Sequence, residues 1–95
     1  MPDSPPLRLL LFVRANAARS LDAIRSVRKA CDADLTRAKS LQVVDVFREP
    51  ELVMKHRVIA TPTLLGLDGS SELRLVGNVS ERLVKDYFAA EAYAV

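Results

Sequence analysis

Hydrophobic and polar positions follow two different periods along the chain. Leu7 to Arg14 is a dense apolar run, centred on Leu9-Leu10-Leu11-Phe12-Val13, with the length and composition of a strand covered on both faces. Residues 41–46 form a second β-rich run. Between them, Ala18 to about Asp32 has helical spacing, with one apolar stripe made of Leu21, Ile24, Val27 and Cys31. This order predicts two parallel strands joined by a right-handed crossover helix.

The second half of the chain predicts a short helix and a hairpin. Glu49-Pro50-Glu51 opens a helix that ends near His56, because proline suits the first helical turn and acidic residues there complement the helix dipole. Two short strands follow, Thr63 to Leu67 and Glu72 to Val76. The segment Asp68-Gly69-Ser70-Ser71 separates them, and Asp-Gly is a strong hairpin signal because both residues tolerate positive φ. We expect the two strands to be antiparallel neighbours.

A last helix is predicted after Ser80, which can cap its N-terminus. Its apolar face consists of Leu83, Val84, Tyr87, Phe88 and Ala92. The predicted order βαβαββα describes an α/β fold with a mixed four-stranded sheet and helices on both faces, which is the thioredoxin-like arrangement. Folds of this type place a cis-proline at the start of the third strand, so this analogy predicts a cis bond at Pro62.

Length and composition indicate one domain. The chain has 95 residues, of which 49% are hydrophobic and 27% charged, close to the averages of globular proteins. We expect the proline-rich residues 1–6 to be disordered and residues 7–95 to form the domain. No apolar run approaches the ~18 residues of a membrane span, and no signal peptide is recognisable. With a single cysteine, which suits a reducing compartment, these features favour a cytoplasmic protein.

Candidates for catalysis are few. Redox members of the thioredoxin-like fold carry a C-x-x-C motif between the first strand and the first helix, where this chain reads Ala15-Asn16-Ala17-Ala18-Arg19-Ser20. The only cysteine, Cys31, lies at the far end of that helix and is interpreted as a small buried hydrophobe. The only histidine, His56, has no partner at ligand spacing and is interpreted as a surface residue. We expect no enzyme activity, no metal and no cofactor.

The charge distribution does not point to nucleic acid. The net charge is +2, and basic residues outnumber acidic ones only in residues 1–40. No aromatic platform and no binding motif accompany the basic side chains of this half, which include Arg14, Arg19, Arg25, Arg28 and Lys29. They are interpreted as the solvated face of a helix.

Four segments, in order from about residue 8 to residue 82, match one known family. They are Leu10-Leu11-Phe12-Val13 with Asn16 and Ser20, Val43-Val44-Asp45-Val46 with Pro50 and Leu52, Ile59-Ala60-Thr61-Pro62-Thr63-Leu64, and Gly77-Asn78-Val79-Ser80. Together they resemble the KaiB proteins of bacterial circadian systems and the KaiB-like sensor domain at the N-terminus of the SasA histidine kinase.

The resemblance implies a regulatory protein that is not an enzyme and that docks on the N-terminal ATPase ring of KaiC, a hexameric kinase and ATPase. A circadian or stress-response role is expected, with the chain as a monomer or weak homo-oligomer. The alternative is a stand-alone signalling adaptor related to the SasA sensor domain, with a histidine kinase as partner. Neither nucleic acid nor a membrane is an expected partner. The candidate partner-binding residues are Arg25, Arg57, Asn16 and Ser20.

Clock KaiB proteins also adopt a second, tetrameric fold, and two differences in this chain favour the thioredoxin-like one. The clock proteins have a proline-rich segment where this chain has its Asp-Gly hairpin signal. A glycine and an aspartate near their C-terminus are matched here by Phe88 and Ala90, which removes a helix-weakening residue worth ~1 kcal/mol. We expect a thioredoxin-like resting state, with these structural residues: Pro62, Asp68, Gly69, Gly77, Phe88 and Ala90.

Overall fold

The computed structural model describes residues 6–35, 37–69 and 71–93. These form a sheet and helices in the order β1 (Leu7–Val13), α1 (Ala18–Ala33), β2 (Lys39–Asp45), α2 (Pro50–His56), β3 (Thr63–Asp68), β4 (Ser71–Val76) and α3 (Glu81–Tyr93). The predicted thioredoxin-like order βαβαββα is confirmed. The predicted disorder of residues 1–6 concerns mainly residues 1–5, which lie outside the described residues.

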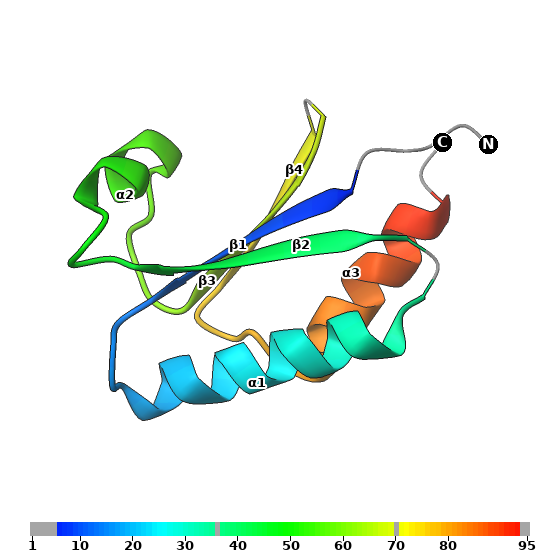
Figure 1. Ribbon diagram of the computed structural model, residues 1–95, viewed down its shortest axis with the longest axis horizontal. Helices are drawn as coiled ribbons and strands as arrows, with labels where there is room; N and C mark the ends of the chain where they lie inside the picture. Colours follow the sequence, from blue (N-terminus) through cyan, green and yellow to red (C-terminus); the bar gives the residue numbers. More distant parts are fainter. Residues whose placement is uncertain (1–5, 36, 70, 94–95) are drawn as a thin grey trace.

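The sheet has the strand order β2-β1-β3-β4 (Figure 1). β1 pairs in parallel with β2 and antiparallel with β3, and β3 pairs antiparallel with β4 as the predicted hairpin. Every residue of β1 except Arg8 is buried. A strand with neighbours on both sides and helices over both faces leaves no face for water, which explains the uninterrupted apolar run in the sequence.

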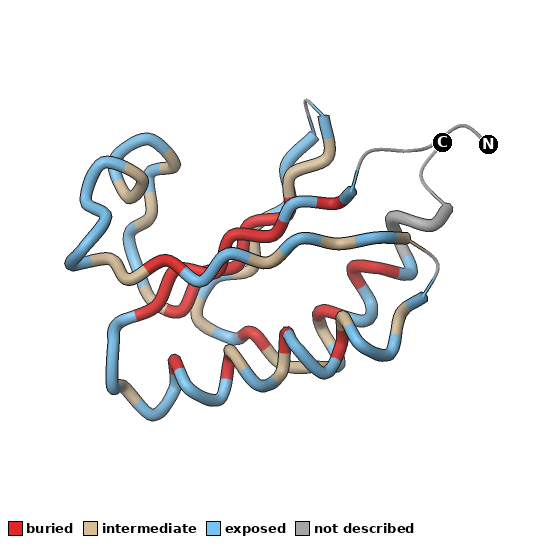
Figure 2. Tube along the Cα trace, in the orientation of Figure 1, coloured by how far each residue is buried: buried red, intermediate tan, exposed pale blue. Residues whose placement is uncertain are grey.

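Two apolar clusters fill the two sides of the sheet. α1 and α3 lie together on one face and α2 lies on the other (Figure 1). The first cluster joins Leu9 and Leu11 of β1 to Val27 of α1 and Val84 of α3. The second joins the alternate residues Leu10 and Phe12 of β1 to Val44, Leu65 and the apolar side of α2. Buried residues therefore gather along the middle of the sheet (Figure 2).

The buried face of α1 differs from the predicted stripe. Leu21 is 49% exposed, and Ile24 and Cys31 are only half-buried. Val27 is buried as predicted, but the other buried residues lie one position before the predicted ones and are small: Ser20, Ala23 and Ala30. Small side chains let a helix approach its neighbours closely, but they contribute little to a hydrophobic pattern, so the sequence placed the inward face one residue too late.

Lys39 joins the end of α1, the start of β2 and α3. Its side chain is 5% exposed, and its Nζ donates hydrogen bonds to the carbonyls of Asp34 at 3.0 Å and Arg37 at 2.7 Å. The ammonium also lies 3.4 Å from the Asp34 carboxylate and 4.8 Å from the centroid of the Phe88 ring. These contacts satisfy a charge that would be costly to bury alone. Phe88 itself is 4% exposed.

The hairpin is fixed at its tip and at its base. Asp68 accepts two hydrogen bonds from the Arg37 guanidinium, at 2.9 and 3.0 Å, which ties the tip to the loop before β2. Gly69 and Gly77 have φ of 60° and 81°, the left-handed conformation that glycine adopts most easily. The Thr61-Pro62 bond is cis, as predicted.

α3 begins as predicted. The Ser80 hydroxyl accepts a hydrogen bond from the Leu83 N–H at 3.2 Å, which is the N-cap interaction. The Lys85 Nζ lies 2.7 Å from the carboxylate of Glu81, one turn earlier, and donates a hydrogen bond to it. This hydrogen bond lowers the pKa of Glu81. Ala90 lies within α3, and its side chain, like that of Ala92, lies outside the described part of the structure. Among the described residues, no helix has the length and apolar character required to cross a bilayer.

The contact between α3 and β3 depends on Gly66. A Cβ at this position would lie 2.7 Å from Cε2 and Cζ of the buried Tyr87 ring. We therefore expect Gly66→Ala to lower the free energy of unfolding by about 1–3 kcal/mol, the usual cost of overpacking a core. Urea denaturation measures this. In the double variant with Tyr87→Leu, the loss should be smaller than the sum of the two single losses. Additive losses would contradict the predicted clash.

Candidate functional site

Four connecting segments meet at one end of the sheet. The loops after the parallel strands β1 and β2, residues 14–17 and 46–49, leave the sheet at the same edge (left in Figure 1). Residues 57–62 lead into the antiparallel β3 at this edge, and residues 77–80 leave β4 there, with the Gly77 N–H bonded to the Pro62 carbonyl at 2.8 Å. We call these four segments the loop edge. Ligands of open α/β sheets bind at the carboxyl ends of the parallel strands, which is this end.

Asn16 and Ser20 shape the first of these loops. Asn16 is exposed and has a φ of 68°, in the left-handed region that asparagine tolerates better than most residues. Ser20 is 2% exposed, and its hydroxyl accepts a hydrogen bond from the Arg14 N–H at 3.0 Å. A residue so deeply buried has no surface to offer a partner. The expected direct contact by Ser20 is therefore corrected: its hydroxyl holds the loop that displays Asn16.

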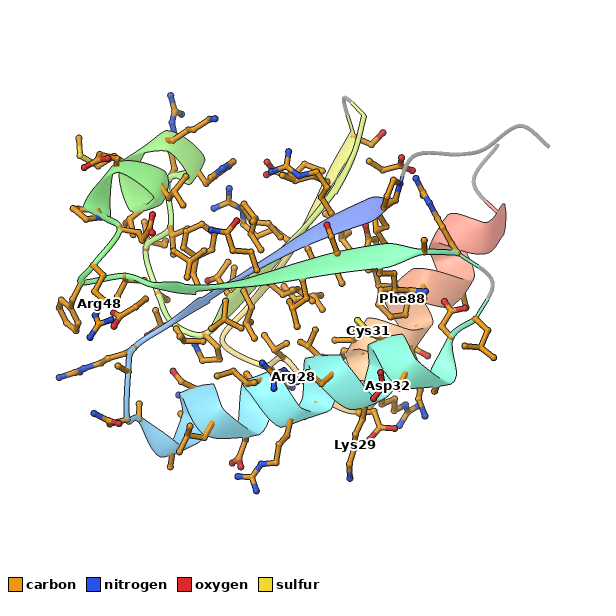
Figure 3. The ribbon with its side chains drawn as sticks, in the orientation of Figure 1. Arg28, Lys29, Cys31, Asp32, Arg48 and Phe88 are labelled. Atoms are coloured by element: carbon orange, nitrogen blue, oxygen red, sulfur yellow. The ribbon has the colours of Figure 1, made fainter. Side chains whose placement is uncertain are left out.

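Phe47 is an exposed aromatic residue that sequence reasoning missed. Its side chain is 72% exposed, and the Arg14 guanidinium carbon lies 5.9 Å from its ring centroid. The Asp45 carboxylate accepts a hydrogen bond from the Phe47 N–H at 3.0 Å and so orders the turn that carries the ring. Arg48, beside it, is 86% exposed, and its Nε lies 3.8 Å from the same Asp45 carboxylate (Figure 3). The only available signal was an aromatic residue directly after a strand and outside any apolar stripe.

Arg57 is the first residue of the 57–62 segment of the loop edge and directly follows α2. It ends that helix in the left-handed conformation, with φ 52°, and its side chain is exposed. Its carbonyl accepts a hydrogen bond from the Arg74 guanidinium at 3.0 Å, which fastens the end of α2 to β4. Met54 and Ile59, on either side of it in the chain, are 78% and 92% exposed. A positive charge is thus flanked by exposed apolar groups.

Arg25 lies apart from Arg57. Arg25 projects from α1, its side chain is 71% exposed, and its guanidinium lies 3.2 Å from the Asp22 carboxylate on the same helix. α1 and α2 cover opposite faces of the sheet, so the two arginines belong to opposite layers. A partner that touches both has to extend around the loop edge or around a side of the sheet.

The described residues of the loop edge hold no thiol. Cys31 lies near the other end of α1, on the side toward α3 (Figure 3), where burial raises the pKa of its thiol. A raised pKa disfavours the thiolate, which is the reactive form. His56 is half-buried, and its ring packs edge-on against the Phe12 ring with 6.0 Å between the ring centroids. It is therefore a packing residue and not the surface residue expected. No group of His, Cys, Asp and Glu side chains within the described ranges could hold a metal ion.

Comparison with known proteins identifies the family. The sequence profile of the KaiB domain matches residues 10–89, which is most of the chain. The chain belongs to the KaiB family. The circadian clock oscillator protein KaiB of a Synechococcus species is 30% identical over 74 residues, covering 78% of this chain and 67% of that protein. KaiB of Prochlorococcus marinus is 31% identical over 74 residues, covering 78% of this chain and 63% of that protein.

Solved structures agree with this KaiB assignment. The N-terminal domain of Synechococcus elongatus SasA is 26% identical, with a TM-score of 0.79, and the match covers 100% of this chain and 93% of that domain. Chloroplastic thioredoxin z is 17% identical with a TM-score of 0.80, and the match covers 94% of this chain and 80% of that protein. The thioredoxin match shows the fold alone. The predicted resemblance to KaiB and to the SasA domain is thereby confirmed.

The left-handed conformation of Asn16 generates a prediction about stability in this KaiB-family chain. Asn16→Ala should lower the free energy of unfolding by about 0.5–1 kcal/mol, because alanine tolerates positive φ poorly, whereas Asn16→Gly should change it by less than about 0.5 kcal/mol. The neighbouring Ala15→Gly is the matched control, since φ there is not positive. Ala15→Gly should lower the free energy of unfolding, because glycine raises the conformational entropy of the unfolded chain and relieves no positive φ in the folded one. Urea unfolding of the three variants distinguishes these outcomes, and equal losses in both Asn16 variants would contradict the prediction.

Proposed function

We propose that this KaiB-family chain is a non-enzymatic regulatory protein that binds the N-terminal ring of a KaiC-like ATPase in a circadian or stress-response system. The observation that supports this most is the chemistry of the loop edge. Where redox members of the fold carry a pair of thiols, this chain has Asn16 on a fixed loop. The neighbouring segment after β2 displays the exposed Phe47 beside Arg14. Such groups bind protein surfaces and have no reactive atom.

The exposed residues of the loop edge suit a protein partner with acidic and apolar groups. Aromatic and arginine side chains are enriched among the residues that contribute most to protein interfaces. Phe47 and Ile59 are large apolar groups left in water, and a partner that covers them gains their burial. Arg14, Arg48 and Arg57 supply the positive charge that would steer an acidic surface toward them.

The absence of enzyme activity is part of the proposal. The single thiol of the chain is half-buried and has a raised pKa, so no activated nucleophile is in place for thiol chemistry. No cofactor or metal is needed for a role in binding. A cytoplasmic location and a single domain over residues 7–95 complete the proposal, because one unpaired cysteine suits a reducing compartment.

The thioredoxin-like arrangement is proposed as the resting state. Three contacts support it, and each joins an element of the second half of the chain to a distant segment: Phe88 over Lys39, Tyr87 against Gly66, and Asp68 with Arg37. A rearranged second half would lose all three together. A switch between two folds requires packings within a few kcal/mol of each other, and these contacts weigh against that balance.

Backbone chemical shifts from NMR in solution test the resting state. Residues 63–68 and 71–76 should show strand shifts and residues 81–93 helical shifts in one set of signals. The order βαββααβ, or a second set of signals of comparable intensity, would contradict the proposal.

Binding to a KaiC-like ATPase should depend on Arg25 and Arg57. We expect Arg25→Gln and Arg57→Asn each to weaken the affinity about three- to tenfold, because each removes a positive charge from the proposed interface. Asparagine is chosen at residue 57 because it tolerates the left-handed conformation found there. Isothermal titration calorimetry with nucleotide present measures the effect.

Arg8→Gln is the control for this experiment. Arg8 is an exposed arginine near the start of β1, at the end of the sheet opposite the loop edge, and its loss should leave the affinity unchanged. No complex between the wild-type chain and the ATPase in native mass spectrometry would overturn the proposed function. Equal weakening by all three substitutions would show that only net charge matters and would refute the assigned contacts.

A stand-alone signalling adaptor is the second candidate. The observation that favours it is the structural match to the SasA N-terminal domain, with a TM-score of 0.79 over 93% of that domain. In this role the chain would bind a histidine kinase. The same titration with a SasA-type kinase separates the two functions, since binding to the kinase without binding to the ATPase supports the adaptor.

A further inference from the structure

β4 is an edge strand that is open along its outer side. Among the described strands, β3 is its only neighbour, and the β3–β4 ladder runs from Thr63–Val76 to Asp68–Ser71 without a bulge. The strand contains neither proline nor lysine, the residues that often protect an edge from pairing. Leu73 is 38% exposed and Val76 49% exposed, and both lie in a strand that is exposed or half-buried throughout (Figure 2).

The alternation of the backbone identifies the groups that face outward. The Gly77 N–H donates to the Pro62 carbonyl and therefore points toward the β3 side. In an antiparallel ladder the N–H and C=O of one residue point to the same side, and the side alternates along the strand. Leu73 and Leu75 thus direct their backbone groups to β3, and Glu72, Arg74 and Val76 direct theirs outward.

Charge selects one register for a second strand on this edge. If β4 pairs with the β4 of another copy, its outward residues must face each other. A register centred on Glu72 would place the Glu72 carboxylates of the two copies directly opposite each other. A register centred on Arg74 would do the same with the two Arg74 guanidiniums. Like charges in directly opposite positions are destabilising. A register centred on Leu73 places each Glu72 opposite the Arg74 of the other copy and leaves Leu73 opposite its own equivalent.

We propose that β4 pairs antiparallel with β4 of a second copy of this chain, about a twofold axis at Leu73. The outward backbone groups of Glu72 and Arg74 form the hydrogen bonds of this pairing. Within each copy Arg74 lies 3.2 Å from the Glu72 carboxylate, and the cross-strand pairs extend this contact into a cluster of four alternating charges that sets the register. The Leu73 side chains meet on the sheet face that α1 and α3 cover. The two sheets become one continuous sheet.

The interaction is weak, because it uses one short edge. Stable protein interfaces bury at least ~1,200 Å², and the contact of two six-residue strands is smaller, so we expect a dissociation constant on the order of 0.1–1 mM. The other edge strand, β2, does not select a register in this way. Its exposed positions, Ser40, Gln42 and Val43, carry no pair of opposite charges. Because the proposed pair uses the side of the sheet, both loop edges stay accessible, and this inference does not depend on the proposed function.

Charge reversal tests the register. Glu72→Arg and Arg74→Glu should each weaken self-association roughly fivefold or more, because each turns both cross-strand pairs into like charges. Mixed together, the two variants should associate with each other more strongly than either does with itself, because every cross-strand pair is then of opposite charge. NMR titration of one isotope-labelled variant with the other measures this, with shifts expected at residues 71–75.

Leu73→Lys provides a variant that keeps the contacts of Arg74 with α2. It places two ammonium groups opposite each other at the axis, and it should abolish the concentration dependence of the diffusion coefficient measured by NMR. Leu35→Lys is the matched control, since Leu35 is 90% exposed and lies in the loop between α1 and β2, and it should leave self-association unchanged. A wild-type chain that remains monomeric up to ~1 mM, or a dimer insensitive to Leu73→Lys, would overturn the proposal.

Discussion

The burial of β1 on both faces is the constraint on which the rest of the structure depends. Six of its seven residues are buried, so each side of the sheet needs a layer of its own. α1 and α3 cover one face and the shorter α2 covers the other. The parallel pairing with β2 requires a crossover, which is α1, and the antiparallel pairing with β3 brings the hairpin to the other side. The positions of the loop edge and of the two edge strands follow from this.

The second half of the chain is held to this frame by a few polar contacts placed at junctions. The buried ammonium of Lys39 satisfies two carbonyls of the segment between α1 and β2 and lies against Phe88 of α3. The Arg37 guanidinium binds the tip of the hairpin through Asp68. The Lys39–Phe88 and Arg37–Asp68 contacts join segments far apart in the sequence, so the loss of either exposes groups that the other helps to bury.

A thioredoxin-like frame without thiols at its loop edge is suited to recognition. The backbone of the first loop is held by the buried Ser20 hydroxyl, and the turn after β2 is held by Asp45, so Asn16 and Phe47 are displayed on ordered supports. Ordered supports reduce the entropy lost on binding. The family assignment and these supports underlie the proposed binding role, and the pairing proposed for β4 would use a second surface along the side of the sheet.

The sequence by itself determined the order of the elements, the hairpin, the N-cap at Ser80 and the family. These features depend on local chemistry: periodicity, the φ preferences of Asp-Gly, and motifs read residue by residue. Tertiary structure alone decided the inward face of α1, the burial of Ser20, the packing of His56 on Phe12 and the exposure of Phe47. It also decided that Arg25 and Arg57 lie in opposite layers. The physical reason is that a period indicates which residues share a face of an element, whereas burial depends on which distant segment packs there and how closely its side chains allow it to approach.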